Sequence, residues 1–315
     1  MNARRGQSGI ALITAILVVA IAAIASAAIL GSANIAIRRT ANLQESELGW
    51  WYAVGVEGWI KTILDRDQDQ NRFDSLRDAW AMPVDFLPID EGYIRGGVVD
   101  LQGRFNLNNL ATPDPTQYAQ QVQIFVRILR YAEVAEEYQA TAIAAAIRDW
   151  IDADQEPTGA DGIEDSEYLR GDIPYRAANR MMAGVSELLA VRGIDKKAFA
   201  RVSGMLCALP QIGTPINVNT APPAVLMALA SGGGPELELF LRERAEKPIE
   251  SSGQIASRLG PAFNEVPRSM LTINSNFFML RAEVFIGSGR TALYSFFFRP
   301  SQGNTAVYGR STDVE

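Results

Sequence analysis

The hydrophobic pattern of the chain begins with one long apolar segment. Residues 10–37 contain no Asp, Glu, Lys or Arg. As a helix they would extend about 42 Å, more than the roughly 30 Å of a bilayer's hydrocarbon core. Arginines flank the segment at Arg4, Arg5, Arg38 and Arg39. Because the short leader is basic, the pattern predicts a single membrane crossing with a cytoplasmic N-terminus.

An amphipathic pattern follows directly. Leu48, Tyr52, Val56, Trp59 and Ile63 recur at spacings of 4, 4, 3 and 4 residues, which places them on one helix face. Residues 1–82 contain no proline, so nothing forces a break between the two halves. The pattern predicts one continuous helix of about 55 residues, apolar first and amphipathic afterwards. This shape resembles the stem of a pilin.

Three interpretations of the apolar segment are open on hydropathy alone. It fits an uncleaved anchor, a secretory signal cut after Ala25-Ser26-Ala27, or the stem left after removal of a prepilin leader. The junction between Gly9 and Ile10 resembles the bond cut by prepilin peptidases, because a basic leader ends in Gly and an apolar residue follows. Continuation of the helical pattern past the signal-peptide site also favours the prepilin interpretation.

Strand patterns lie near both ends of the remaining chain. Residues 65–92 are polar with two prolines and predict a loop, and residues 93–110 alternate, which predicts two short strands around Gln102-Gly103. Residues 276–287 and 290–300 predict a hairpin that turns at Ser288-Gly289. Since one isolated hairpin is marginal in water, we expect these strands to form one sheet on the N-terminal helix.

Between the strand regions the periodicity becomes helical. The pattern predicts helices at 118–134, 136–150, 174–191, 195–208, 222–231 and 236–246. The predicted fold class is α+β: a type IV pilin-like long helix packed on a small antiparallel sheet, with a large inserted all-α domain. The predicted divisions are a leader at 1–9, a membrane part of the helix at 10–37, the amphipathic helix and first strands at 38–112, the α-domain at 113–266 and the last strands at 267–315.

Composition removes several classes of function. The chain has 315 residues, no His and one Cys, which excludes Ser-His-Asp and Cys-His nucleophiles, His-ligated zinc and an intramolecular disulfide. The net charge of −7 argues against a nucleic-acid partner. Asn217 to Pro223 resembles the start of a DNA-binding helix-hairpin-helix, but a loop ahead of a capped helix explains it better. We interpret Cys207 as a small buried hydrophobic residue.

Several runs together resemble the K-type minor pseudopilins of bacterial type II secretion systems (the GspK/XcpX family). They are the Gly9–Ile10 junction, GRFNLNNL at 103–110, DWIDAD at 149–154, Glu164-Asp165 with Tyr168, PYRAAN at 174–179 and NVNTAP at 217–222. The resemblance implies a non-enzymatic subunit at the tip of the pseudopilus, which starts or caps assembly. It implies cleavage by prepilin peptidase and methylation, and a single-pass inner-membrane protein whose bulk is periplasmic. The implied partners are the I and J minor pseudopilins, other pseudopilus subunits and the inner-membrane assembly platform.

Thr14 gives the tip position a physical argument. Pilin-like subunits resemble each other in having Glu at mature position 5, where it compensates the terminal ammonium of a neighbour already in the filament. Counted from Ile10, this chain has Thr14 there. A carboxylate in hydrocarbon is costly unless it is paired. A subunit that enters first has no earlier neighbour and can lack the Glu; the alternative is that Thr is simply tolerated in apolar helices.

Acidic residues concentrate in one loop. Residues 149–172 hold nine carboxylates and one arginine, a net charge of −8. Either the loop is solvated, or a divalent cation orders it, and Ca²⁺ fits best because it accepts 6–8 oxygens in loose geometry. The spacing is not that of an EF-hand, since Pro157 stands where Gly belongs. The family resemblance implies calcium in this domain, and the candidate ligands are Asp152, Asp154, Glu156, Glu164 and Asp165.

Three further hypotheses concern the residues around this loop and the function. Asp149 is a candidate helix cap, or a partner of Arg148 or Arg176. Trp50 and Trp51 are expected to pack beneath the sheet, with part of the pair facing a partner subunit. The alternative functions are a periplasmic carboxylate-based hydrolase released by signal peptidase, for which paired acids would act on glycosides, and a minor pilin of a type IV pilus.

Overall fold

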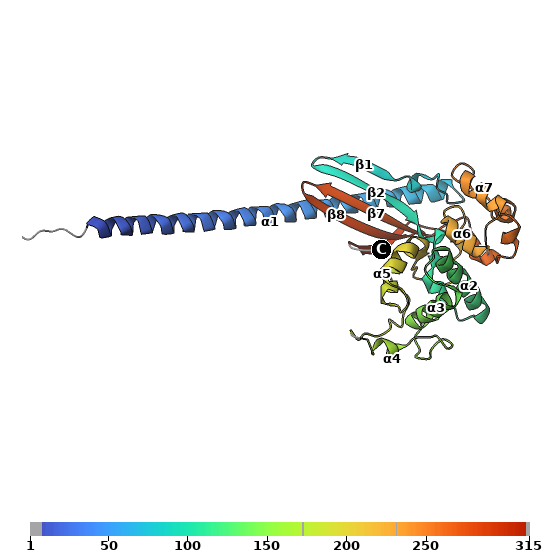
Figure 1. The fold of residues 1–315 in the computed structure, drawn as a ribbon. Helices are drawn as coiled ribbons and strands as arrows, with labels where there is room; N and C mark the ends of the chain where they lie inside the picture. Colours follow the sequence, from blue (N-terminus) through green and yellow to red (C-terminus); the bar gives the residue numbers. More distant parts are fainter. Residues whose placement is uncertain (1–7, 172, 231, 313–315) are drawn as a thin grey trace, which may run out of the picture.

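A single helix dominates the shape of the molecule (Figure 1). The computed structural model describes residues 8–171, 173–230 and 232–312, so the first seven residues of the expected leader lie outside it. Helix α1 (Ser8–Gln70) runs unbroken for 63 residues, which confirms the predicted continuous stem. Its apolar first part projects alone, with Ile10 and Ile24 65% and 70% exposed. Among the described residues, α1 is the one helix long and apolar enough to cross a membrane.

A five-stranded antiparallel sheet packs on the second half of α1. Its order is β1 (Val84–Ile89), β2 (Gly92–Asp100), β7 (Phe277–Ile286), β8 (Gly289–Phe298) and β9 (Ala306–Ser311). The predicted β7–β8 hairpin is confirmed, and so is its pairing in one sheet with a strand that precedes the helical domain. The second strand predicted within 93–110 is reduced to residues 105–106, which pair outside this sheet. The predicted loop at 65–92 was wrong at both ends, because α1 extends to Gln70 and β1 contains Pro88. Pro88 is tolerated because β1 is an edge strand.

The contact between helix and sheet follows the period of two along β7. Phe278, Leu280 and Ala282 alternate toward α1, where they meet Ile60 and Leu64. All five side chains are at most 8% exposed. Removing this apolar surface from water is what holds the sheet on the stem.

The helical domain lies at the end of the sheet that is farther from the apolar part of α1 (Figure 1). Its helices are α2 (Pro115–Tyr131), α3 (Glu137–Ile151), α4 (Asp165–Tyr168), α5 (Lys196–Val202), α6 (Pro223–Leu229), α7 (Pro235–Glu243) and α8 (Ile255–Leu259). Two parallel strand pairs join it, β3 (Phe105–Asn106) with β4 (Leu206–Cys207) and β5 (Ile216–Asn217) with β6 (Leu271–Thr272). Short 3₁₀ helices occupy Ala79–Ala81, Leu101–Gly103, Leu107–Ala111, Val185–Ala190, Ser203–Met205, Ser252–Gln254, Pro261–Asn264 and Arg268–Met270.

Two predicted helices differ from the structure. The helix expected at 174–191 is wrong, since only Val185–Ala190 forms a 3₁₀ helix there. The backbone before it is held by distant partners instead: the amide of Ala177 donates to Asp165, and that of Asn179 donates to the carbonyl of Trp150. The helix expected at 195–208 ends at Val202, and its last residues form a 3₁₀ turn and strand β4.

Three buried asparagines of the 103–110 run tie the helical domain together. Asn106, Asn108 and Asn109 are at most 2% exposed. The Asn108 side chain donates to the carbonyls of Met182 and Leu209, and its oxygen accepts from the Met182 amide. Buried amide side chains must satisfy both donor and acceptor groups. Here they do so by joining loops about 75 to 100 residues apart.

Candidate functional site

The acidic loop joins α3 to α4 and brings three carboxylates together. Asp149 lies in the last turn of α3, Asp152 directly follows that helix and Glu164 directly precedes α4. One oxygen of each lies within 4.8 Å of the others. Asp149 is 0% and Glu164 4% exposed. Asp149 and Glu164 are thus shielded from water while Asp152 is half-buried beside them, and such a group of carboxylates is stabilised by protons or by a cation.

Asp149 organises the loop backbone. Its Oδ1 accepts from the amide of Thr158 at 2.9 Å, and its Oδ2 accepts from the amide of Ile163 at 2.5 Å. The expected arginine partners bind elsewhere, since Arg148 lies 3.9 Å from Asp152 and Arg176 lies 3.9 Å from Asp165. Asp149 therefore fastens both sides of the loop to the end of α3 and aims its charge into the cluster.

Glu164 is the most under-satisfied group of the cluster. Neither of its carboxylate oxygens has a hydrogen-bond partner among the described residues, and the same is true of Oδ1 of Asp152. Burial, followed by the charges of Asp149 and Asp152, raises the pKa of Glu164 to about 7. Burial, followed by the charges of Asp154 and Asp149, raises the pKa of Asp152 to about 6. Buried acceptors without donors are the arrangement that a hard cation satisfies.

The five candidate ligands divide into two groups. Asp152 and Glu164 belong to the cluster, and Asp154 lies close enough for its charge to act on both. Asp165 accepts from the Ala177 amide at 2.9 Å, and Glu156 is exposed. Asp149, the third member of this cluster, was not among the residues that the sequence singled out as candidate ligands. The signal that could have found it is its position one helical turn before Asp152.

In a second group of acidic residues, an arginine side chain already supplies the positive charge. Asp67, Asp74 and Asp78 also have oxygens within 4.8 Å of one another. Arg299 enters this group, with Nη1 3.0 Å from Asp67 and Nη2 2.5 Å from Asp74. A guanidinium supplies the charge and donors that these carboxylates require. The acidic loop thus differs from this group in having unpartnered oxygens.

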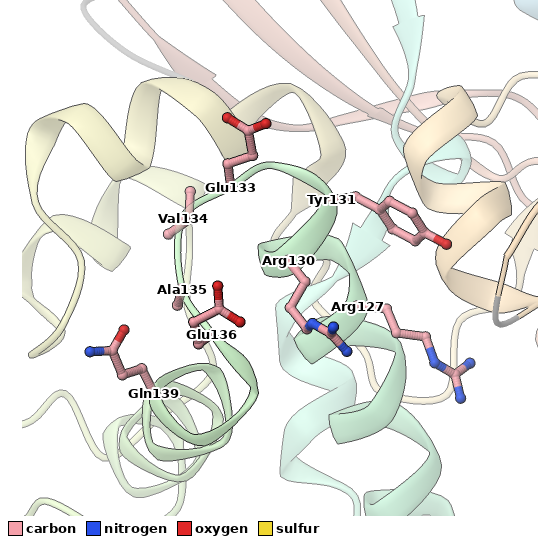
Figure 2. Close-up of a pocket in the computed structure, with 8 residues that line it drawn as sticks. All are labelled: Arg127, Arg130, Tyr131, Glu133, Val134, Ala135, Glu136 and Gln139. Atoms are coloured by element: carbon pink, nitrogen blue, oxygen red, sulfur yellow. The ribbon is translucent and has the colours of Figure 1, made fainter.

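The surroundings of the loop do not resemble a sugar-binding platform. Trp150 and Tyr168 are 6% and 5% exposed and pack edge-on against each other, with ring centroids 5.4 Å apart. A hollow of about 580 Å³ lies at the turn between α2 and α3, and Figure 2 shows Arg127, Arg130 and Glu136 among its lining side chains. None of the three clustered carboxylates lines this hollow.

The other residues predicted to be functional, the Gly9–Ile10 junction and Thr14, lie at the start of the stem. Gly9 and Ile10 lie in the first turn of α1. The hydroxyl of Thr14 donates to the backbone carbonyls of Ile10 at 3.1 Å and Ala11 at 3.0 Å. Thr14 can therefore reside in hydrocarbon with its donor satisfied by its own helix. A Glu at this position would have no such local solution.

An apolar groove lies where α1 meets the edge of the sheet. Trp51 and Trp59 remain 62% and 49% exposed, whereas the neighbouring Trp50 is half-buried against the sheet core. Only part of the tryptophan pair thus packs as expected. The groove has a volume of about 390 Å³. It is lined by Leu48, Trp51, Tyr52, Gly55, Val56, Trp59, Leu87, Ile89 and Ile94.

Comparisons with known proteins agree over almost the whole chain. The family model for type II secretion system (T2SS), protein K, matches residues 103–211. Type II secretion system protein K of Aeromonas hydrophila is 31% identical over 98% of this chain and 98% of its own. The protein of the same name from Pseudomonas aeruginosa is 33% identical over 98% of this chain and 93% of its own.

A solved structure supports the same conclusion. One chain in the crystal structure of the GspK-GspI-GspJ complex from the enterotoxigenic Escherichia coli type 2 secretion system superposes with a TM-score of 0.77. It is 28% identical, and the match covers 88% of this chain and 100% of that one. The chain therefore belongs to the type II secretion system protein K family, as a pseudopilin component of that system rather than an enzyme.

Proposed function

We propose that this chain is the minor pseudopilin at the tip of the type II secretion pseudopilus, where it starts and caps assembly together with the I- and J-type minor pseudopilins. The observation that carries the proposal is the match of nearly the whole fold to a chain crystallised with GspI and GspJ. The long α1 stem supplies the part that packs with other stems. Its small residues permit close helix approach within lipid.

The position of the helical domain supports a terminal place. The domain stands at the end of the sheet that is farther from the apolar part of α1 (Figure 1). A subunit stacked above would have to occupy the same space. Thr14 supports the same place, since its satisfied hydroxyl needs no neighbour in the membrane.

The proposal includes processing and location. Prepilin peptidase would cut between Gly9 and Ile10, which keeps the apolar half of α1 as a single-pass inner-membrane anchor and leaves the bulk of the chain in the periplasm. N-terminal sequencing of the mature chain is expected to begin at Ile10, with a methylated amine. A start at Ala28 would instead show release by signal peptidase, and would favour the soluble hydrolase over the pseudopilin.

The apolar groove beside α1 is the proposed seat for a partner's stem. An amphipathic helix with an apolar face fits a groove lined by tryptophans and aliphatic side chains. A photo-reactive amino acid at Trp51 is expected to cross-link the I- or J-type subunit in cells that secrete through this system. The same group at Lys197, exposed on α5, serves as the control. Equal cross-linking at both positions, or none at Trp51, would refute the proposal that a partner's stem binds in this groove.

A structural Ca²⁺ ion completes the proposal. The residues fit it, because Glu164 and Asp152 offer buried oxygens that lack donors, and Asp149 and Asp154 add charge beside them. When bound, the ion would neutralise the cluster and order the loop between α3 and α4. Asp165 and Glu156 remain predicted ligands.

A further inference from the structure

The pilin sheet and the helical domain meet at a buried polar joint that none of the functions above uses. It combines residues from six places in the chain: the end of α1, the segment after it, the end of β2, the end of β5 with the loop that follows, the segment before β7 and the segment after β8. We define the joint by Asp67, Asp74, Asp100, Asn217, Thr220, Ser275 and Arg299. Six of the seven side chains are at most 7% exposed, and Thr220 is half-buried.

The helical domain contributes the run from Asn217 to Pro223, which resembles the start of a DNA-binding helix-hairpin-helix. The Asn217 side chain donates to Oδ2 of Asp100 at 3.0 Å and to the carbonyl of Asp74 at 3.2 Å. The Thr220 hydroxyl lies 2.6 Å from Oδ2 of Asp100. Asn219 adds a bond to the same Asp74 carbonyl. This loop therefore fastens the helical domain to the pilin domain.

The pilin side links the same two carboxylates to each other. The amide of Ser275 donates to Oδ2 of Asp74 at 2.7 Å, and its hydroxyl lies 2.6 Å from Oδ2 of Asp100. Arg299 donates to Asp74 at 2.5 Å and to Asp67 at 3.0 Å. Asp74 and Asp100 therefore belong to one network, and of these two carboxylates only Asp74 has a recorded contact with Arg299.

The charges of this network do not balance. The joint contains three buried carboxylates, those of Asp67, Asp74 and Asp100, and one guanidinium, that of Arg299, which contacts Asp67 and Asp74. The hydrogen bonds recorded for Asp100 among the described residues come from neutral groups. Burial raises the pKa of Asp74 to about 7 and also raises that of Asp100. Because the recorded partners of Asp100 among the described residues are neutral, its buried carboxylate is the one in the joint whose charge a proton would neutralise.

We propose that this joint is a proton-linked lock between the helical domain and the stem. With the proton present, a hydroxyl of Thr220 or Ser275 turns to accept from Asp100, and the two domains are held in one orientation. Loss of the proton leaves an unneutralised charge away from water, which weakens the loop's attachment and frees the helical domain to move. The closed joint holds its proton to higher pH than the open one, so acid closes the lock and alkali opens it.

Distance measurements between the two domains test the lock. Spin labels at exposed Asp90, in the β1–β2 turn, and at Lys197, on α5, would report the orientation in the full mature chain, with Cys207→Ala as background. We expect a narrow distance distribution at about pH 6 and one roughly twofold broader at about pH 8.5, and the change should be reversible. A distribution of the same width at both values would overturn the proposal.

Two variants separate the lock from a general effect of pH. Asp100→Asn imitates the protonated acid and is expected to keep the distribution narrow at both pH values. Glu57→Gln changes a buried carboxylate of α1 that lies outside the joint and accepts from Ser295 and Arg310, and is expected to keep the pH response of the parent. Broadening in Asp100→Asn equal to that of the parent would refute the assignment. If Asp100→Asn does not fold, as circular dichroism would show, the parent's own pH response still decides whether the lock exists.

Discussion

Asp149 and Gly162 show how two residues shape the acidic loop. The Asp149 carboxylate binds two loop amides, and one of them lies directly after Gly162. A Cβ at position 162 would collide with this carboxylate and with the backbone nitrogen of Thr158. Glycine is therefore required for close approach rather than for a special turn. The loop is built so that its backbone satisfies Asp149 while the oxygens of Glu164 are left without donors.

The raised pKa of Glu164 predicts a pH dependence of the metal-free chain. Its ordinary pKa of 4.5 rises to about 7 in the fold, so the folded state holds the proton more tightly than the unfolded state. The free energy of unfolding should therefore fall as pH rises from about 4.5 to about 7, by on the order of 1–3 kcal/mol. Glu164→Gln should flatten this part of the slope. Urea unfolding in EGTA across this range measures it.

This prediction needs a matched control, because the raised pKa of Asp74 also makes the free energy of unfolding fall as pH rises. The test quantity is therefore the difference between parent and variant. Glu156→Gln removes an exposed carboxylate from the same loop and should retain the parent slope. If Glu164→Gln and Glu156→Gln behave alike, the buried position of Glu164 is not the cause.

At the scale of elements, periodicity was informative where burial was one-sided. It predicted the long α1, helices α2 and α3, and the β7–β8 hairpin, since each buries a regular face. It missed β1, which contains Pro88 and directly follows Pro83, a composition that signals a loop, and it missed β9, a short edge strand. The false helix at 174–191 has helix-forming composition, but its amides are taken by Asp165 and Trp150 across the fold. Tertiary partners overrode local propensity there.

The candidate site, like the fold, could be predicted from the sequence only in part. The density of acids identified the loop and two members of the cluster, Asp152 and Glu164. Sequence spacing could not show that Asp165 turns toward Ala177 or that Asp149 turns inward, because both depend on how the loop folds back onto α3.

Calcium should stabilise this loop and with it the helical domain. At a free concentration about 100 times Kd, an ion that binds only the folded state adds about 2.7 kcal/mol to the free energy of unfolding. We therefore expect the domain's melting temperature to rise with Ca²⁺ and to fall in EGTA, as calorimetry would show. Asp152→Asn should abolish the difference. Asp161→Asn, which removes a loop charge bonded to Tyr138 instead, should preserve it; an unchanged melting temperature in the parent would remove the claim.

On the scale of the whole molecule, the uneven distribution of charge has a structural meaning. The loop at 149–172 carries −8 of a total of −7, so the rest of the chain is close to neutral. Figure 1 places this loop, on both sides of α4, far from the apolar part of α1. The apolar part of α1, the sheet and the acidic loop thus form separate regions of one molecule, and the joint at Arg299 connects the sheet to the helical domain that carries the loop. A terminal subunit needs this separation, because one end must join other stems while the other must block them.

The membrane end provides the last prediction, for which Thr14 is the test position. In Thr14→Glu, a first-entering subunit would carry a carboxylate with no neighbour's ammonium to pair with, at a cost of about 2–3 kcal/mol. We expect fewer pseudopili and reduced exoprotein secretion, measured by electron microscopy of cells that overproduce the major subunit and by export assays. Thr14→Val removes the hydroxyl without adding charge, so it should behave like the parent. If Thr14→Glu starts filaments as well as the parent does, the subunit has a neighbour when it enters, and the proposed first place in the filament is wrong.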